Sequence, residues 1–276
     1  TQGVSRILMP IVSQYNVVGI IESQIRKTEH GKSLLFNIAR KVYVTLNIKK
    51  KTLKSFSSRN KIPFYYMNNG SDSNLEKWVK NKKPDIIIVY SMSQLLRRNI
   101  FDIPTYGTLN LHPSILPKYR GPNPWFWMYY NMEKKGGVTL HFIDDCEDTG
   151  DIVYQEEFEI PLGIKSSELQ DLAIGQIGVG LILKALKNIN NLPKLKQPKT
   201  SPTKRARNIK NDEHKILINW TEFNVEKIWH ILRGTEMWFE AIETPKNIFK
   251  GNKLIIEHYE KCNMTGFKIG RINKEK

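Results

Sequence analysis

The fold of this chain is decided by Asn110-Leu-His112-Pro-Ser-Ile-Leu-Pro-Lys-Tyr-Arg-Gly121, together with the later Glu147-Asp148-Thr149-Gly150-Asp151. The first segment begins within a short strand pattern, and the second lies between two further strand patterns. Together they supply an amide, an imidazole and a carboxylate that can converge when those strands adjoin. Such a set suits proton transfer and the stabilisation of a developing negative charge.

Strand patterns and helical patterns alternate along the first half of the chain. Strands are predicted at Val17–Glu22, Pro63–Met67, Asp85–Tyr90 and Gly107–Leu111, with helical or mixed stretches at Thr1–Tyr15, Ser33–Ser57 and Ser73–Asn81. This order predicts a parallel sheet with crossover helices. Because such a sheet opens with a strand, we expect a first strand of about a dozen residues before Thr1. The sequence contains no Gly-x-Gly-x-x-Gly motif, so a dinucleotide cofactor is not predicted.

The second half of the chain begins with a strand pair and a long helix. Strands are predicted at Val138–Ile143 and Ile152–Glu159, on either side of Asp148. Ser167–Asn190 is predicted to be helical, with Ser167 and Gln170 forming a capping box. Leu192–Asn211 is rich in proline and basic residues and lacks apolar periodicity, which is typical of a linker.

These segments, in this order, resemble the formyl-transfer domain shared by methionyl-tRNA formyltransferase, nucleotide-sugar N-formyltransferases and glycinamide ribonucleotide transformylase. The resemblance runs from about Val17 to Tyr154 and is weaker beyond. It implies an α/β fold with a Rossmann-like, mostly parallel sheet and flanking helices. Residues 1–191 are then a formyltransferase catalytic domain, 192–212 a linker, and 213–276 an abbreviated C-terminal β-rich subdomain.

The resemblance also implies a set of site residues. Asn110 would stabilise the oxyanion, His112 would shuttle protons, and Asp148 would orient or assist the imidazole. The formyl donor would be 10-formyltetrahydrofolate, and no metal is implied. The pterin is expected at Ser93, Gln94, Leu95, Leu96, Ile143, Asp144 and Asp145, and the acceptor at Lys118, Tyr119 and Arg120. Bracing of the loop by Arg120 is an equally weighted alternative to substrate binding.

Composition narrows the class of protein and of partner. The formal net charge of +16 favours anionic partners, such as nucleic acid, a nucleotide-sugar diphosphate or the folate glutamate tail. The only two cysteines, Cys146 and Cys262, argue against a disulfide framework and fit a reducing cytoplasm. The longest strongly apolar run, Ile86–Tyr90, is too short to span a bilayer, so no membrane partner is expected.

Two segments bear on the formyl acceptor. Ser23–Lys32 lacks the Pro-, Gly- and basic-rich pattern with which the bacterial tRNA enzyme grips the acceptor stem. The aromatic run Pro122–Tyr130 is more similar to sugar N-formyltransferases of cell-surface polysaccharide clusters, although such rings also pack a core. The favoured hypothesis is formylation of a dTDP- or UDP-linked amino-deoxysugar for a surface polysaccharide such as lipopolysaccharide O-antigen, by a cytoplasmic homodimer.

Two alternatives remain open. The first is a methionyl-tRNA formyltransferase, the one case in which the chain would bind nucleic acid. That alternative is supported by a group of basic residues, namely Lys204, Arg205, Arg207 and Lys210. The second is a non-catalytic relative that senses folate or binds a partner; the presence of all three catalytic residue types disfavours it.

Overall fold

The computed structural model describes residues 2–23, 52–68, 72–210, 213–219, 222–235, 254–261 and 267–274. Most of the Ser23–Lys32 loop, most of the predicted Ser33–Ser57 helix and Cys262 lie outside these ranges. The chain forms two compact units: Thr1–Asn110 with Ile143–Asp145, and Leu111–Phe142 with Cys146–Lys276. These units do not follow the expected limits at 191 and 212, and that division stays a prediction.

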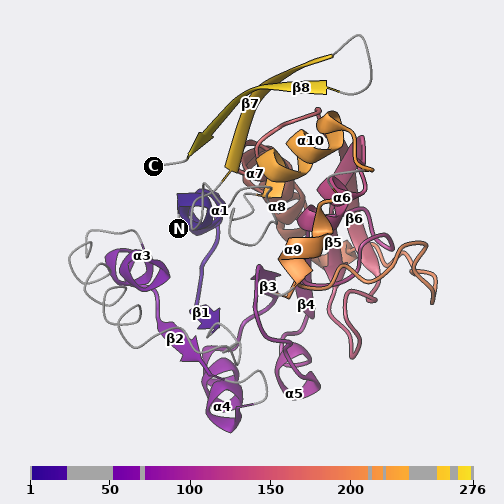
Figure 1. The fold of residues 1–276 in the computed structure, drawn as a ribbon. Coiled ribbons are helices and arrows are strands. Elements are labelled where there is room, and N and C mark those ends of the chain that lie inside the picture. Colours follow the sequence, from indigo (N-terminus) through magenta and orange to yellow (C-terminus); the bar gives the residue numbers. More distant parts are fainter. Residues whose placement is uncertain are drawn as a thin grey trace. The chain divides into compact units, whose positions relative to one another are not determined.

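The first unit alternates helices and strands. It contains α1 (Gln2–Val12), β1 (Ile20–Ser23), α3 (Leu53–Arg59), β2 (Phe64–Met67), α4 (Ser73–Lys82), β3 (Ile87–Tyr90) and α5 (Arg98–Phe101) (Figure 1). β1 and β2 pair in parallel, with Ile20 opposite Phe64. α4 begins at Asp72, whose carboxylate accepts the Asn74 N–H at 2.8 Å, and ends at the left-handed Lys83.

Apolar side chains from these elements form the core of the first unit. The buried members are Met67, Leu75, Val79, Val89, Leu96, Ile100 and Phe101. They come from β2, α4, β3 and the segment from Leu96 through α5, so the crossover helices and the strands share one apolar cluster. This is the packing that alternating strands and amphipathic helices require.

β4 (Thr108–His112) carries the chain from the first unit into the second. The second unit contains α6 (Pro124–Tyr130), β5 (Lys135–Phe142), β6 (Ile152–Glu159), α7 (Ser166–Gln170), η1 (Asp171–Gly178), α8 (Val179–Lys187), η2 (Ile189–Asn191), α9 (His214–Leu217), α10 (Val225–Thr235), β7 (Leu254–Lys261) and β8 (Phe267–Lys274). The strand order β3-β4-β5-β6 joins the predicted strands, and β5 and β6 pair antiparallel. The expected fold, a mostly parallel sheet with flanking helices and a small C-terminal β-rich part, is confirmed.

The predicted long helix is present as the continuous succession of α7, η1 and α8, of which η1 is π-helical. Its cap differs from the prediction: the carboxylate of Glu168 accepts the Lys165 N–H at 3.3 Å, so Ser167 and Gln170 do not form the capping box. Ser166–Lys187 is long and apolar enough to cross a membrane by length and composition. Its side chains Leu169, Ile174, Leu181 and Ile182 are buried in the structure, which is also what the core helix of a globular protein shows.

Part of the segment Leu192–Asn211, which the sequence predicts to be a linker, makes contacts with other parts of the second unit. Leu195 and Ile152 exchange main-chain hydrogen bonds of 2.8 and 3.0 Å, which adds a short antiparallel bridge beside β6. Farther along, the indole Nε1 of Trp127 donates to the Arg207 carbonyl at 2.8 Å. Composition alone does not report such contacts, because proline and lysine are common both in linkers and in ordered extended segments.

The aromatic run supplies mainly core contacts. Phe126 of α6 belongs to a buried cluster with Leu217, Ile218, Ile228, Ile231 and Leu232, and Trp127 and Tyr130 pack against this cluster. The ring of Trp125 instead stacks on Phe158 of β6 at 6.3 Å between centroids. Most of the rings therefore join α6 to α10, as aromatic residues at helical spacing usually do.

His230 of α10 makes the stability of the second unit sensitive to acid. It is only 2% exposed, and its Nδ1 accepts the Gly163 N–H at 2.9 Å, which requires a neutral ring. Burial lowers its pKa from 6.5 to about 4. The unfolded chain therefore binds this proton more readily, and the stabilisation present above pH 6.5 is lost as the pH falls towards 4.

We expect His230→Gln, whose amide oxygen can still accept from Gly163, to remove part of this acid sensitivity. Between pH 7.5 and 4.5 the wild type should lose roughly 2 to 3 kcal/mol more unfolding free energy than the variant. Urea unfolding at the two pH values measures the difference. Equal losses in both proteins would contradict the assignment.

Candidate active site

His112 ends β4, and its imidazole is buried, with 4% of the residue exposed. Its Nε2 lies 3.0 Å from the carbonyl oxygen of Tyr119. Because a carbonyl can only accept, Nε2 carries the proton and donates, which leaves the Nδ1 lone pair as the basic position. That Nδ1 lies 3.6 Å from Oδ2 of Asp148.

The loop after β4 is held on β5 and β6 by a chain of hydrogen bonds. Thr139 Oγ1 donates to the Ser114 carbonyl at 2.6 Å and accepts the Leu116 N–H at 3.1 Å. The amide of Gln155 reaches the Leu116 carbonyl at 2.8 Å. Tyr119 then adopts a left-handed φ of 58°, which turns its carbonyl towards His112. The loop is therefore pre-shaped to orient the imidazole.

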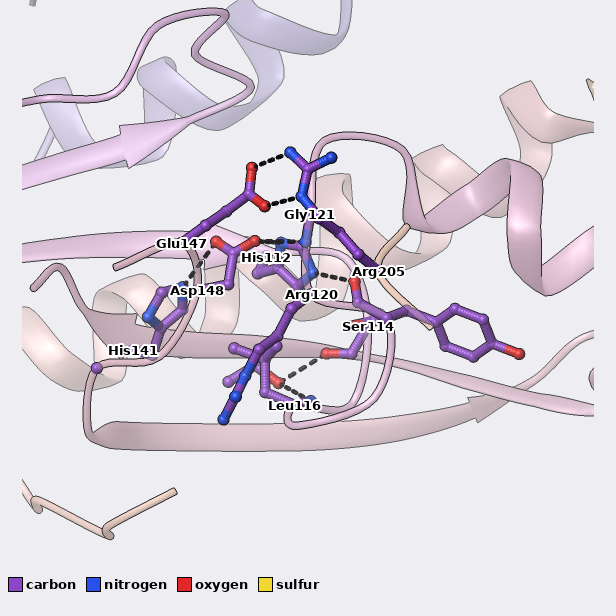
Figure 2. Close-up of polar contacts among 12 residues, drawn as sticks. His112, Ser114, Leu116, Arg120, Gly121, His141, Glu147, Asp148 and Arg205 are labelled. Carbon is purple, nitrogen blue, oxygen red and sulfur yellow. Dashed lines mark hydrogen bonds and ion pairs between the residues drawn. The ribbon is translucent and has the colours of Figure 1, made fainter. Parts of the chain in front are cut away.

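The second catalytic loop follows β5 and places Asp148 opposite His112. The N–H of Phe142 donates to the Asp151 carbonyl at 2.9 Å and closes the loop. Oδ2 of Asp148 accepts the Gly121 N–H at 2.8 Å, and Oδ1 lies 3.6 Å from Nε2 of His141. Figure 2 shows this carboxylate between His141 and the amide of Gly121. One carboxylate thus faces two imidazoles.

Burial and charge act in opposite directions on these groups. Burial lowers the pKa of His112, while the negative charge of Asp148 raises it; the net shift is downward, so the ring is neutral at pH 7. Burial also raises the pKa of Asp148, but the two imidazoles and the Gly121 N–H outweigh it and lower that pKa to about 2. A neutral imidazole beside an ionised carboxylate can accept a proton, and the carboxylate stabilises the resulting cation.

Asn110 lies two residues before His112 on β4 and is half-buried. Alternate residues of a strand share a face, so the amide and the imidazole are presented on the same side of β4. The oxyanion role of Asn110 remains a prediction. Asn110 is the last residue of the first unit before the chain passes to His112 in the second, and the joint role of Asn110, His112 and Asp148 stays a prediction.

The residues predicted to bind the pterin all belong to the first unit. Ser93 hydrogen-bonds Ser23 at 3.1 Å, and the amide of Gln94 donates to the Asn68 carbonyl at 2.9 Å. Leu96 is a buried core residue, whereas Leu95 is 46% exposed. Their binding role remains a prediction.

The other half of the predicted pterin set follows β5. Ile143 packs against the same core cluster as Leu96, and its N–H donates to the Thr108 carbonyl at 2.8 Å. Asp145 forms an ion pair with Arg98. Ile143–Asp145 and Ser93–Leu96 belong to the same unit, and the binding of the pterin by these residues stays a prediction.

The residues predicted to bind the acceptor have unlike environments. Lys118 is exposed, and its carbonyl accepts from Ser114 Oγ at 2.8 Å. The hydroxyl of Tyr119 is bound to Glu133 at 2.6 Å, and burial raises its pKa to about 12. Arg120 is 8% exposed, and its guanidinium bonds to residues 197–199, which is the bracing arrangement rather than one open to a ligand.

Sequence reasoning did not identify His141 or Gln197 as part of the site. His141 is the one ionisable residue in the predicted strand Val138–Ile143, and that was the available clue. Nothing in the local sequence marks Gln197, which reaches the site only through tertiary packing. Within the residues that the structure describes, no cluster of His, Cys, Asp or Glu could hold a metal ion.

Gly150 permits the close turn that carries Asp148. A Cβ at this position would lie 1.9 Å from the Phe142 carbonyl oxygen, a main-chain atom that cannot swing away. We expect Gly150→Ala to lower the melting temperature and to reduce activity, because the loop must shift. Gly180→Ala in α8 is the matched control, since a Cβ there meets nothing within 4 Å and should stabilise the helix by about 0.5–1 kcal/mol. Equal melting temperatures for the two variants would contradict the close approach.

The chain matches a family model described as "Formyl transferase" over residues 12–173. It is 30% identical over 241 residues to a methionyl-tRNA formyltransferase of Clostridium beijerinckii, covering 87% of this chain and 72% of that protein. It is 35% identical over 192 residues to the same enzyme of Carboxydothermus hydrogenoformans, covering 69% of this chain but only 59% of that protein. WlaRD, a sugar 3N-formyl transferase solved with dTDP and 5-N-formyl-THF, has a similar fold, with a TM-score of 0.62, 20% identity, and coverage of 99% of this chain and 93% of that one.

Proposed function

Because the chain belongs to the formyl transferase family, we propose that it transfers a formyl group from 10-formyltetrahydrofolate to the amino group of a nucleotide-linked amino-deoxysugar. The observation that carries the transfer chemistry is the pair of buried His112 and largely buried Asp148, in which Nδ1 and Oδ2 lie 3.6 Å apart. The sugar is dTDP- or UDP-linked, and its formamide serves a surface polysaccharide such as O-antigen. The enzyme acts in the cytoplasm as a homodimer.

The pair of His112 and Asp148 accounts for the movement of protons. The acceptor amine attacks the formyl carbon, a C–N bond forms, and the bond from that carbon to the folate nitrogen breaks. The amine loses a proton to Nδ1 of His112, and the departing folate nitrogen gains one, so protons balance over the reaction. Asp148 stabilises the imidazolium between these two transfers, and Asn110 donates to the oxygen that becomes negative.

The choice of acceptor rests on how the basic residues are used. Arg205 forms a bidentate pair with Glu147 at 2.5 and 2.7 Å, and Arg207 a similar pair with Glu213. These two arginines are therefore neutralised within the chain, which leaves fewer cations for an RNA backbone. The net charge of +16 is compatible with an anionic acceptor such as a nucleoside diphosphate.

Formylation of methionyl-tRNA is a second candidate, favoured by the names of the relatives that are 30–35% identical. Incubation with 10-formyltetrahydrofolate and a panel of dTDP- and UDP-aminosugars, followed by mass spectrometry, tests the first proposal. A product heavier by the mass of CO supports it. No product with any sugar, together with formylation of methionyl-tRNA, would assign the chain to the second candidate. Size-exclusion chromatography with light scattering checks the homodimer.

A further inference from the structure

The segment Leu195–Arg207, called the strap below, runs along the loop that follows His112. The N–H of Tyr119 donates to Oγ1 of Thr203 at 2.7 Å, and the N–H of Ala206 donates to the Arg120 carbonyl at 2.7 Å. The strap therefore holds the main chain that presents the Tyr119 carbonyl to His112.

The strap also holds the loop that carries Asp148. The side-chain amide of Gln197 donates to the Asp148 carbonyl at 3.1 Å and to the Gly150 carbonyl at 2.7 Å. Arg205 pairs with Glu147, the residue just before Asp148 (Figure 2). Two strap side chains thus hold the acidic loop on either side of its catalytic residue.

The side chain of Gln197 forms hydrogen bonds with residues of both loops. While its Nε2 donates to the acidic loop, its Oε1 accepts from Nη2 of Arg120 at 2.8 Å. The same guanidinium donates to the carbonyls of Pro198 and Lys199 at 2.8 and 3.1 Å. Among the described residues no carboxylate pairs with Arg120, so neutral strap oxygens alone solvate this buried cation, and its Nε has no partner there.

We propose that Gln197 is a positioning residue for formyl transfer, which holds the backbone of Asp148 where its carboxylate meets the Gly121 N–H and faces His112. An amide suits this place because it donates from one end and accepts at the other. The proposal rests on the proposed function only in that His112 and Asp148 are taken to be catalytic. The placement of the carboxylate can be tested without any acceptor.

Three variants distinguish the positioning of Asp148 from a general contribution of the strap to stability. Gln197→Leu removes both sets of hydrogen bonds, while Gln197→Glu keeps an acceptor for Arg120 but loses the donors to the acidic loop. Lys196→Gln is the matched control in the strap, since it removes only the pair between an 85% exposed lysine and Asp151. Thermal unfolding checks that each variant is folded. If Gln197→Leu does not fold, Gln197→Glu takes its place in the turnover measurement.

The first measurement is the NMR titration of His112 in the full chain without ligands. The signal of His112 is identified as the one that is missing from the spectrum of His112→Gln. His112 is faced by Asp148, His141 and Glu147, and Asp148 is the group that most strongly raises its pKa. Gln197→Leu should therefore lower the pKa of His112, as Asp148→Asn should, and the pKa of His112 in the variant that carries both changes should be no lower than in Asp148→Asn alone. Gln197→Glu is left out of this measurement, because its own carboxylate raises the pKa of His112. An unchanged or raised pKa of His112 in Gln197→Leu would overturn the proposal.

The second measurement is steady-state turnover with 10-formyltetrahydrofolate and the aminosugar panel. Each Gln197 variant should lose about 10- to 100-fold in kcat, with an unchanged KM for the folate. In the Asp148→Asn background the same changes should add no further loss, because Gln197 acts through that residue. Additive losses, or a rise confined to KM, would refute positioning. A wild type that forms no product refutes the proposed function instead, while the titration still decides the role of Gln197.

Discussion

His112→Ala is expected to fold and to lose nearly all formyl transfer, a decrease of about 10²- to 10⁴-fold in kcat. The physical reason is the position of the imidazole: it is buried, its Nε2 is committed to the Tyr119 carbonyl, and its Nδ1 faces Asp148. The amine therefore loses its proton acceptor when the ring is removed, and bulk water cannot replace it in a buried site. Rates of product formation at saturating 10-formyltetrahydrofolate measure the loss.

The control for His112→Ala is His230→Gln, which changes another buried histidine of the second unit. His230 bonds to Gly163 and takes no part in the site, so this variant should keep wild-type turnover at pH 7.5. Turnover of His112→Ala within a few-fold of the wild type would remove His112 from the mechanism. Loss of activity in both variants would point to a general effect on folding.

Asp148→Asn is expected to cost about 10²- to 10³-fold in kcat, the range found when one transition-state-stabilising polar group is lost. The asparagine keeps an oxygen for the Gly121 N–H but removes the charge that stabilises protonated His112. Because the pKa of His112 then falls, the acid limb of the pH–rate profile should move to lower pH. A limb that moves to higher pH, or does not move, would contradict this coupling.

The stability of Asp148→Asn follows from the same pKa of about 2. A carboxyl group whose pKa lies below its ordinary value of 3.8 stabilises the fold above that value and ceases to do so as the pH falls through 2. The variant should therefore lose up to about 2 kcal/mol of unfolding free energy at pH 7. Asp151→Asn is the matched control, since Asp151 pairs with Lys196 outside the trio and its change should leave turnover intact.

Much of the fold followed from periodicity and spacing. Most predicted elements lie within a few residues of the observed ones. This holds for the strands that end at Met67, Tyr90, His112, Phe142 and Glu159, and for the helices that follow Thr1, Asp72 and Lys165. The short helix α5 was not predicted, because Arg98–Phe101 is less than two turns long and has no side-chain cap. The capping box was misplaced by two residues, since Ser167 and Lys165 both precede acceptor-bearing side chains at suitable spacing.

The candidate site was predicted less completely than the fold. His112 and Asp148 lie opposite each other, as expected of residues that flank adjoining strands, while their catalytic roles stay a prediction. The sequence left bracing by Arg120 as one of two alternatives, and it did not predict the second imidazole from His141 or the contact from Gln197. Each depends on where a side chain points after the loops have packed, and no periodic pattern encodes that direction.

The sequence by itself determined which groups the chain carries and on which elements they lie: an amide and an imidazole on one strand face, and a carboxylate in a glycine-containing loop. These properties follow from local rules, namely strand alternation and turn chemistry. Only the tertiary structure decided the ionisation of His112 and Asp148, because desolvation and facing charges come from residues distant in the chain. It also decided the contacts of the strap, because hydrogen bonds between segments about 50 to 80 residues apart cannot be predicted from composition.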